Sequence, residues 1–250
     1  MPRPEGLEFA ALFRPAGYVS GDIFDIRQVD EEKWAFFLAD VVGHGVPAAL
    51  LTMVVSRALV TRERVGKLWK PVEPSNALAR INDELCAQPE GPQRFATSVY
   101  GTIDALTREV VMAGAGHPPP LLVDPRGGIV RIEMDGPLLG VFDGAEFPQV
   151  RFVLPENRTL LLYTDGFELA FPDRGVGRGN WKLPTTTYLS HLGQLAAENE
   201  AGEPDLPGAV RRLEELLDAQ LGSLNRPDDV TALAVAARPR TAGAAGVAAA

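Results

Sequence analysis

The sequence predicts an α+β domain in which helices cover antiparallel sheets. Strand-like runs alternate with pairs of helix-like runs rather than with single helices, a pattern typical of α+β layers and not of parallel strand-helix-strand units. Short sequences rich in turn-forming residues, such as residues 125–128, separate the strand-like runs. The 250-residue chain is 46% hydrophobic and 23% charged, which matches a globular chain with a sizeable core.

The first part of the chain is expected to contain one strand, a hairpin and two helices. Residues 7–14 alternate between two sets of side chains, as in a half-buried strand. Residues 22–29 and 34–39 flank a charged turn and predict a β-hairpin. Apolar residues at helical spacing, after a proline in the first turn, predict a helix over residues 47–64, and a second helix is expected to begin near Pro74.

The middle of the chain is expected to form a largely antiparallel meander. Its strand-like runs cover residues 95–103, 109–115, 121–123, 129–132 and 158–164. After a glycine-rich connector, residues 185–198 and 207–221 predict helices, and residues 229–236 predict a last strand. We expect one domain over residues 1–238, followed by an Ala/Gly-rich tail over residues 239–250 that is disordered.

Charge and composition exclude several functional classes. The net charge of −9 has the wrong sign for a protein that binds the phosphate backbone of nucleic acids. The sequence contains neither a secretory signal nor an apolar run of about 18 residues, so we expect a cytoplasmic protein without membrane contact. One cysteine, Cys86, and three histidines cannot build a Cys/His zinc cage, so a metal site would consist mainly of oxygen ligands.

Acidic residues stand at the ends of several predicted strands. Asp22 opens one strand of the first hairpin, and Asp40 ends its partner. Because the start of one antiparallel strand and the end of its neighbour lie at the same edge, these two carboxylates are expected to face each other. Asp165 ends a later apolar strand, and Asp228 with Asp229 opens the last one. The strand-end acids are therefore expected to converge.

A cluster of carboxylates predicts metal-dependent phosphoester hydrolysis. Neighbouring carboxylates repel one another and raise each other's pKa unless cations lie between them. Oxygen ligands without imidazole or thiolate select Mg²⁺ or Mn²⁺, and two such ions lower the pKa of a bridging water and hold phosphate oxygens. Each aspartate taken singly is also explained as a turn residue that accepts backbone N–H groups. Spacing leaves both interpretations open.

Seven motifs, in order, are similar to those of a known family. They are PAGYVSGDIFD (15–25), LADVVGHGVPAAL (38–50), FATSVYGTID (95–104), AGAGHPPPLL (113–122), GPLLGV (136–141), LLYTDGFELA (161–170) and RPDDVTALAV (226–235). The chain resembles the bacterial metal-dependent (PPM-type) phosphatases of the protein phosphatase 2C superfamily, in the branch of the stage II sporulation phosphatase E and the general-stress-response phosphatases. The resemblance extends from about residue 7 to residue 236.

The resemblance implies a fold and a set of metal ligands. The fold is a four-layer sandwich, two central antiparallel β-sheets flanked by α-helices. Asp22, Asp40, Asp165 and Asp228 are implied to be catalytic. Asp22 and Asp40 are implied to be shared by two Mn²⁺ or Mg²⁺ ions, with the backbone carbonyl of Val41 as a further ligand. Asp165 and Asp228 are implied to bind one of these ions, and Asp229 is the adjoining acid and a weaker candidate. In this chain Ser20 replaces the first glycine of the usual Gly-Gly-Asp, which leaves the acid in place.

Three further residues stand near the predicted site. Arg14 ends the first predicted strand near Asp22, where a guanidinium could contact a substrate phosphate. His44 is a second candidate for the phosphate, but it follows Asp40 by four residues, whereas the proposed general acid of the eukaryotic branch follows by two. A loop-shaping role is therefore favoured for His44, and a structural role for His117.

The resulting hypothesis is a phosphoserine/phosphothreonine protein phosphatase in which a metal-bridging water attacks phosphorus. By resemblance its substrate is a phosphorylated anti-anti-sigma factor in a partner-switching pathway, with a separate regulatory protein and a homodimer as open options. One alternative is a catalytically weak, phosphatase-like binding module, against which the intact acidic positions argue. Another is a metal phosphohydrolase acting on a small phosphoester, although the sequence contains neither a GK[ST] loop nor a strand-linked GxGxxG.

Overall fold

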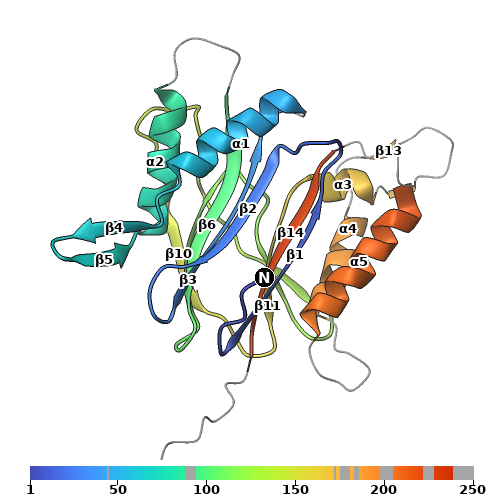
Figure 1. Ribbon diagram of the computed structural model, residues 1–250. Coiled ribbons are helices and arrows are strands. Elements are labelled where there is room, and N and C mark those ends of the chain that lie inside the picture. The colour runs from blue at the N-terminus through green and yellow to red at the C-terminus, as the bar shows by residue number, and fades with distance from the viewer. Residues whose placement is uncertain are drawn as a thin grey trace, which may run out of the picture.

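A computed structural model describes residues 1–43, 45–87, 94–171, 173–174, 181–182, 186–196, 205–221 and 228–238. Two five-stranded antiparallel sheets face each other, and helices cover the outer face of each sheet (Figure 1). This arrangement confirms the predicted α+β sandwich of four layers. Across the ranges above, no helix is long and apolar enough to cross a membrane.

Each sheet combines strands that are distant in sequence. In spatial order the first sheet contains β1 (Leu7–Arg14), β14 (Val230–Ala237), β11 (Thr159–Tyr163), β8 (Leu121–Val123) and β9 (Ile129–Arg131). The second sheet contains β10 (Gln149–Val153), β7 (Glu109–Ala115), β6 (Ala96–Asp104), β3 (Lys33–Val41) and β2 (Asp22–Gln28). Two small hairpins lie outside the sheets, β4 (Arg62–Val65) with β5 (Leu68–Pro71) and β12 (Asp173–Arg174) with β13 (Trp181–Lys182).

The helices form the outer layers. The second sheet is covered by α1 (Val46–Ala58) and α2 (Pro74–Cys86). The first sheet is covered by α3 (Gly166–Ala170), α4 (Thr187–Leu192), the 3₁₀-helix η1 (Gly193–Ala196) and α5 (Leu206–Leu221). In α2 the buried residues Leu78, Ile81 and Leu85 recur at helical spacing, so one stripe of the helix faces the sheet.

Three apolar layers hold the sandwich together. In β3, Phe36 and Leu38 enter the layer between the sheets, whereas Phe37 and Ala39 pack beneath α1 and α2. Successive side chains of a strand point to opposite faces, so a strand buried on both faces reads as a continuous apolar run. β1 follows the same rule and is buried on both faces near its middle, which corrects the expectation of a half-buried strand.

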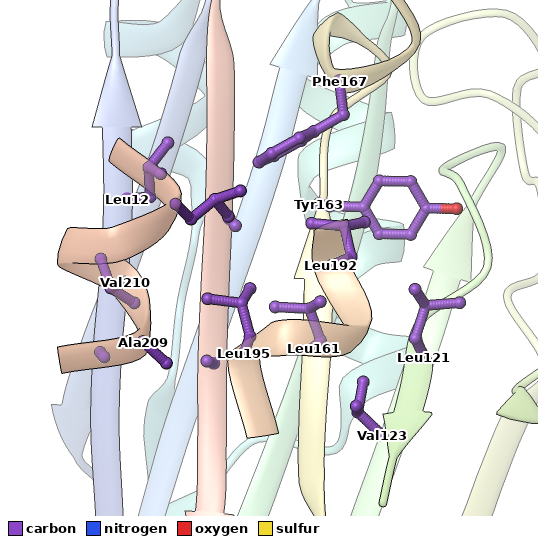
Figure 2. Close-up of a cluster of buried hydrophobic side chains, with 14 of the residues drawn as sticks. Leu12, Leu121, Val123, Leu161, Tyr163, Phe167, Leu192, Leu195, Ala209 and Val210 are labelled. Carbon is purple, nitrogen blue, oxygen red and sulfur yellow. The ribbon is translucent and has the colours of Figure 1, made fainter. Parts of the chain in front are cut away.

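The outer layer of the first sheet contains the third apolar cluster. Figure 2 shows Leu192, Leu195, Ala209 and Val210 of α4, η1 and α5 near Leu161 of β11. All five side chains are buried. Burying a side chain of leucine size stabilises a fold by about 1.5–3 kcal/mol. This layer therefore fixes β11, the strand that precedes Asp165.

Helix α1 ends at Ala58, so the predicted end at residue 64 was wrong. Leu59 adopts extended backbone with φ −67° and ψ 104°. The two residues that follow it are β-branched and favour extended structure. The segment then forms the β4–β5 hairpin, which turns at Gly66 with φ +66° and projects from the body of the molecule (Figure 1).

The strands of the central segment do not form one meander. β6 and β7 belong to the second sheet, β8 and β9 to the first, β10 to the second and β11 to the first. The prediction failed here because periodicity identifies strands but not their partners. Strand β10 and the short helix α3 were not predicted, and the helix expected over residues 185–198 is divided into α4 and η1 in its described part. The expected tail over residues 239–250 lies outside the described residues.

Candidate metal centre

Asp22 and Asp40 face each other at one edge of the second sheet. They are directly paired in the antiparallel register of β2 and β3, as the sequence predicted. Asp22 is buried and Asp40 is half-buried. The backbone packs closely here, because a Cβ on Gly21 would lie 3.1 Å from the carbonyl oxygen of Gly43 and 3.2 Å from that of Val41. A glycine at position 21 therefore allows these carbonyl groups to approach β2.

Two threonines of the first sheet hold the carboxylate of Asp22. Thr164 Oγ1 donates a hydrogen bond to Asp22 Oδ2 at 3.0 Å, and Thr231 Oγ1 donates to the same oxygen at 2.5 Å. The backbone N–H of Thr231 in turn donates to Thr164 Oγ1 at 3.0 Å. Sequence reasoning missed both threonines. They stand inside the YTDG and DDVT motifs, which was the signal that could have identified them.

Asp229 is hydrogen-bonded to the loop between β1 and β2. Its carboxylate oxygens accept hydrogen bonds from the backbone N–H of Ala16 at 2.6 Å and of Gly21 at 2.7 Å. Only 5% of Asp229 is exposed. This carboxylate thus connects the residue before β14 to the loop that leads into β2 at Asp22. Its role as a metal ligand stays a prediction.

Three of the predicted acids line one cavity of about 300 Å³. Asp40, Asp165 and Asp228 contribute to its wall together with Val41 and four other residues, which are Val42, Gly43, Phe95 and Thr97. Asp40 comes from the second sheet, whereas Asp165 follows β11 and Asp228 precedes β14 in the first sheet. The fold therefore brings together acids that are more than a hundred residues apart in the chain.

The acids of this cluster perturb one another's protonation. Burial raises the pKa of Asp40 to about 8, with further contributions from the charges of Asp22, Asp165, Asp228 and Asp229. Burial likewise raises the pKa of Asp22 to about 7, although its two threonine hydrogen bonds act in the opposite direction. The pKa of Asp165 is also raised, chiefly by burial. Without a cation, the cluster holds protons near neutral pH.

The donor set fits a hard divalent cation in chemical type. Carboxylate and backbone carbonyl oxygens are the ligands that Mg²⁺ and Mn²⁺ prefer. Within the described part of the chain, no group of three or more His, Cys, Asp or Glu side chains is already gathered closely enough to hold an ion. One oxygen of Asp22 is turned toward the threonines. A bound cation would neutralise the negative charges that the acids bring together here.

The other predicted residues occupy different positions. Arg14 Nη2 lies 3.4 Å from a carboxylate oxygen of Asp218 and 3.7 Å from one of Glu214, both on α5, and Arg14 does not line the cavity. Its role toward phosphate stays a prediction. His117 is buried, and its Nδ1 lies 2.8 Å from Thr97 Oγ1. Burial lowers the pKa of His117 to about 3, so the ring is neutral. His44 lies outside the described residues.

Comparisons with known proteins identify relatives of this chain. The profile of a family described as "Stage II sporulation protein E (SpoIIE)" matches residues 30–238. The phosphoserine phosphatase RsbP of Bacillus subtilis (strain 168) is 29% identical over 160 residues, which cover 64% of this chain and 39% of RsbP. The chain therefore spans less than half the length of this relative.

Solved structures share the fold. The RsbU and RsbW domains of Rv1364c from Mycobacterium tuberculosis are 27% identical with a TM-score of 0.69, and the match covers 95% of this chain and 61% of that one. RsbX in complex with magnesium is 16% identical with a TM-score of 0.61, covering 94% of this chain and 96% of that one. At 16% identity, the likeness to RsbX concerns the fold alone.

Proposed function

Because the chain belongs to the stage II sporulation protein E (SpoIIE) family, we propose that it is a metal-dependent protein phosphatase that hydrolyses phosphoserine or phosphothreonine. The fold is shared with solved protein phosphatase 2C (PP2C) domains. The observation that carries the proposal is the cavity in which Asp40, Asp165 and Asp228 meet from two sheets. Carboxylates with raised pKa values inside a cavity are typical of functional sites.

We assign the predicted ligands as follows. Asp22, Asp40 and the carbonyl of Val41 would hold two Mn²⁺ or Mg²⁺ ions, and Asp165 and Asp228 would bind one of them. When bound, the ions would activate water and neutralise phosphoryl oxygens. The magnesium complex of RsbX, a protein of the same fold, supports a divalent ion in general and not a particular metal.

The remaining residues of the site orient these groups. Thr164 and Thr231 both donate hydrogen bonds to Oδ2 of Asp22. These two contacts fix the orientation of the carboxylate, and with it the position of Oδ1. Asp229 holds Gly21, the residue directly before Asp22, at the end of the loop between β1 and β2. Hydrogen-bonded partners of this kind determine the orientation of metal ligands, and their loss typically costs 10- to 100-fold in metal affinity or activity. In the reaction, a water oxygen forms a bond to phosphorus, the P–O bond to the side chain breaks, and the released serine or threonine oxygen gains a proton.

The relatives suggest the class of substrate. RsbP is named a phosphoserine phosphatase, and the structure from Mycobacterium tuberculosis joins an RsbU domain to an RsbW domain. We infer that the substrate is a phosphorylated protein of the anti-anti-sigma type, acted on in a partner-switching pathway. This chain spans less than two thirds of the length of either relative. We therefore propose the substrate, the pathway and a separate regulatory protein, and do not transfer them from these relatives.

Metal-dependent hydrolysis is the direct test. The purified chain is expected to release phosphate from an aryl phosphate and from phosphoserine peptides in Mn²⁺ or Mg²⁺, and to lose this activity in EDTA. Asp165→Asn is expected to lower turnover by orders of magnitude, whereas the same change at the exposed Asp143 leaves it unchanged. Absence of hydrolysis with either substrate in either metal would refute the enzymatic proposal and favour a phosphatase-like binding module.

A further inference from the structure

A second cavity adjoins the metal centre and carries a cation suited to the substrate. We propose that Arg131, on strand β9, binds an anionic group of the phosphorylated substrate in this cavity, either the phosphoryl group or an acidic side chain beside it. The inference rests on the proposed phosphatase function. It adds a substrate-binding residue that the metal ligands do not include.

The two cavities adjoin each other at the acids. The second has a volume of about 500 Å³, and Asp40, Thr97 and Asp165 line both cavities. A phosphoryl group at the acids would therefore place the adjoining part of its peptide against the second cavity. Pro118 and Pro119 form part of the wall there and offer no backbone N–H donors.

Arg131 is well placed to meet a negative charge. Among the described residues that line the two cavities, it is the only lysine or arginine. His117, which also lines the second cavity, is neutral because of burial, and Arg14 is paired with acids of α5. Asp40, Asp165 and Glu168 bring negative charge to the second cavity, and a guanidinium among them offers an anionic group a charged hydrogen-bond donor.

The surroundings of Arg131 leave its guanidinium available. It is exposed, and it ends β9, the last strand at one edge of the first sheet. No ion pair joins it to an acid of the described chain. The nearby acid Glu168 instead accepts a hydrogen bond from Tyr188 at 3.4 Å, and the hydroxyl groups of Tyr163 and Tyr188 are 3.4 Å apart. Both tyrosines line the second cavity together with Arg131.

Steady-state kinetics test the role of Arg131. Arg131→Ala is expected to raise the KM for an acid-flanked phosphoserine peptide by about tenfold, with kcat changed by less than about twofold. Arg131→Lys should restore part of the affinity because it keeps the charge. Arg126→Ala is the matched control, since Arg126 is exposed on the turn of the same β8–β9 hairpin and does not line either cavity.

Three substrates identify the anionic group. A raised KM for an aryl phosphate as well as for peptides would place the guanidinium on the phosphoryl group. A raised KM only for a peptide with glutamate beside the phosphoserine, and not for its glutamine counterpart, would place it on the flanking side chain. An unchanged KM for all three substrates would overturn the inference.

A binding measurement separates this inference from the proposed function. Fluorescence anisotropy of a labelled phosphoserine peptide with the Asp165→Asn chain in Mn²⁺ reports affinity without turnover. Adding Arg131→Ala is expected to weaken this binding by about tenfold. If the wild-type chain hydrolyses nothing, the proposed function fails, and anisotropy still decides the role of Arg131. If the wild-type chain is active and Arg131→Ala changes neither KM nor affinity, only this inference fails.

Discussion

The carboxyl group of Asp40 is where burial and like charge oppose ionisation most strongly. Its pKa is raised to about 8 by burial and by Asp22, Asp165 and two further acids, from an ordinary value of 3.8. A carboxyl group whose pKa rises on folding binds a proton more tightly in the folded state than in the unfolded state. The metal-free protein should therefore lose stability as pH rises from about 4 toward about 8.

Asp40→Asn tests this coupling in EDTA. The amide cannot ionise, so the free energy of unfolding of the variant should fall less between about pH 5 and about pH 8 than that of the wild type, by at least about 1 kcal/mol, since one pKa unit corresponds to about 1.4 kcal/mol. Urea unfolding at the two pH values measures this difference. If the free energy of unfolding changed with pH equally in both proteins, the ionisation of Asp40 would not contribute to the pH dependence of stability.

Thr231 is a residue whose role is visible only in the folded molecule. Thr231→Val keeps the shape but removes the hydroxyl that donates to Asp22 Oδ2. Metal affinity, measured by calorimetric titration of Mn²⁺, should fall by about 10- to 100-fold because a metal ligand loses its orientation. The control is Thr159→Val, a buried threonine at the opposite end of β11, which should bind Mn²⁺ like the wild type. Equal affinities for the two variants would contradict the assigned role of Thr231.

At the scale of elements, the β2–β3 hairpin provides Asp22, Asp40 and Val41 of the candidate site. Its register pairs Asp22 with Asp40, and the loop before β2 is tied to Asp229. Gly21, directly before β2, approaches the carbonyl groups of Val41 and Gly43 at the end of β3, and a Cβ there would lie 3.4 Å from Ala48 Cβ of α1. The start of β2 is thus packed against both the end of β3 and α1.

Gly21→Ala is expected to move this loop. The added Cβ would lie 3.1 Å from Gly43 O and 3.2 Å from Val41 O, closer than carbon and oxygen ordinarily approach, so the backbone must shift by a few tenths of an ångström. Mn²⁺ affinity and turnover should fall together by about tenfold or more. Gly17→Ala is the matched control in the same loop, because nothing lies within 4 Å of its Cβ. If Gly21→Ala binds Mn²⁺ as Gly17→Ala does, the close approach has no functional consequence.

At the scale of the whole molecule, the site lies where the two sheets meet. β3 provides one acid, and β11 and β14 flank two more, so the acids converge only when the sheets are packed. Each sheet is fixed by the apolar layer between them and by its own outer helices. Stability and the proposed metal binding therefore depend on the same packing.

Mn²⁺ should accordingly stabilise the entire fold. At about 100 times its dissociation constant, an ion that binds only the native state raises the free energy of unfolding by about 2.7 kcal/mol. Thermal unfolding with Mn²⁺ and with EDTA measures this effect, and Asp40→Asn should reduce the shift in Tm. A wild-type Tm that does not respond to Mn²⁺ would argue against a metal centre in the native fold.

Much of the fold and of the acid cluster followed from the sequence. Strand and helix periods depend on neighbouring residues, so β1, β7, β8 and α2 were located closely. The pairing of Asp22 with Asp40 was predictable because a hairpin with a short turn sets its own register. Motif order then indicated which other acids belong with this pair.

Only the tertiary structure decided which distant groups meet. The division of the central strands between two sheets depends on pairings between segments far apart in the chain, which no local period encodes. The same packing placed Thr164 and Thr231 behind Asp22, and turned Arg14 toward α5. It also placed Arg131 at the cavity beside the acids. Local sequence determines where strands end, whereas the burial of apolar faces between layers determines which strand ends share a site.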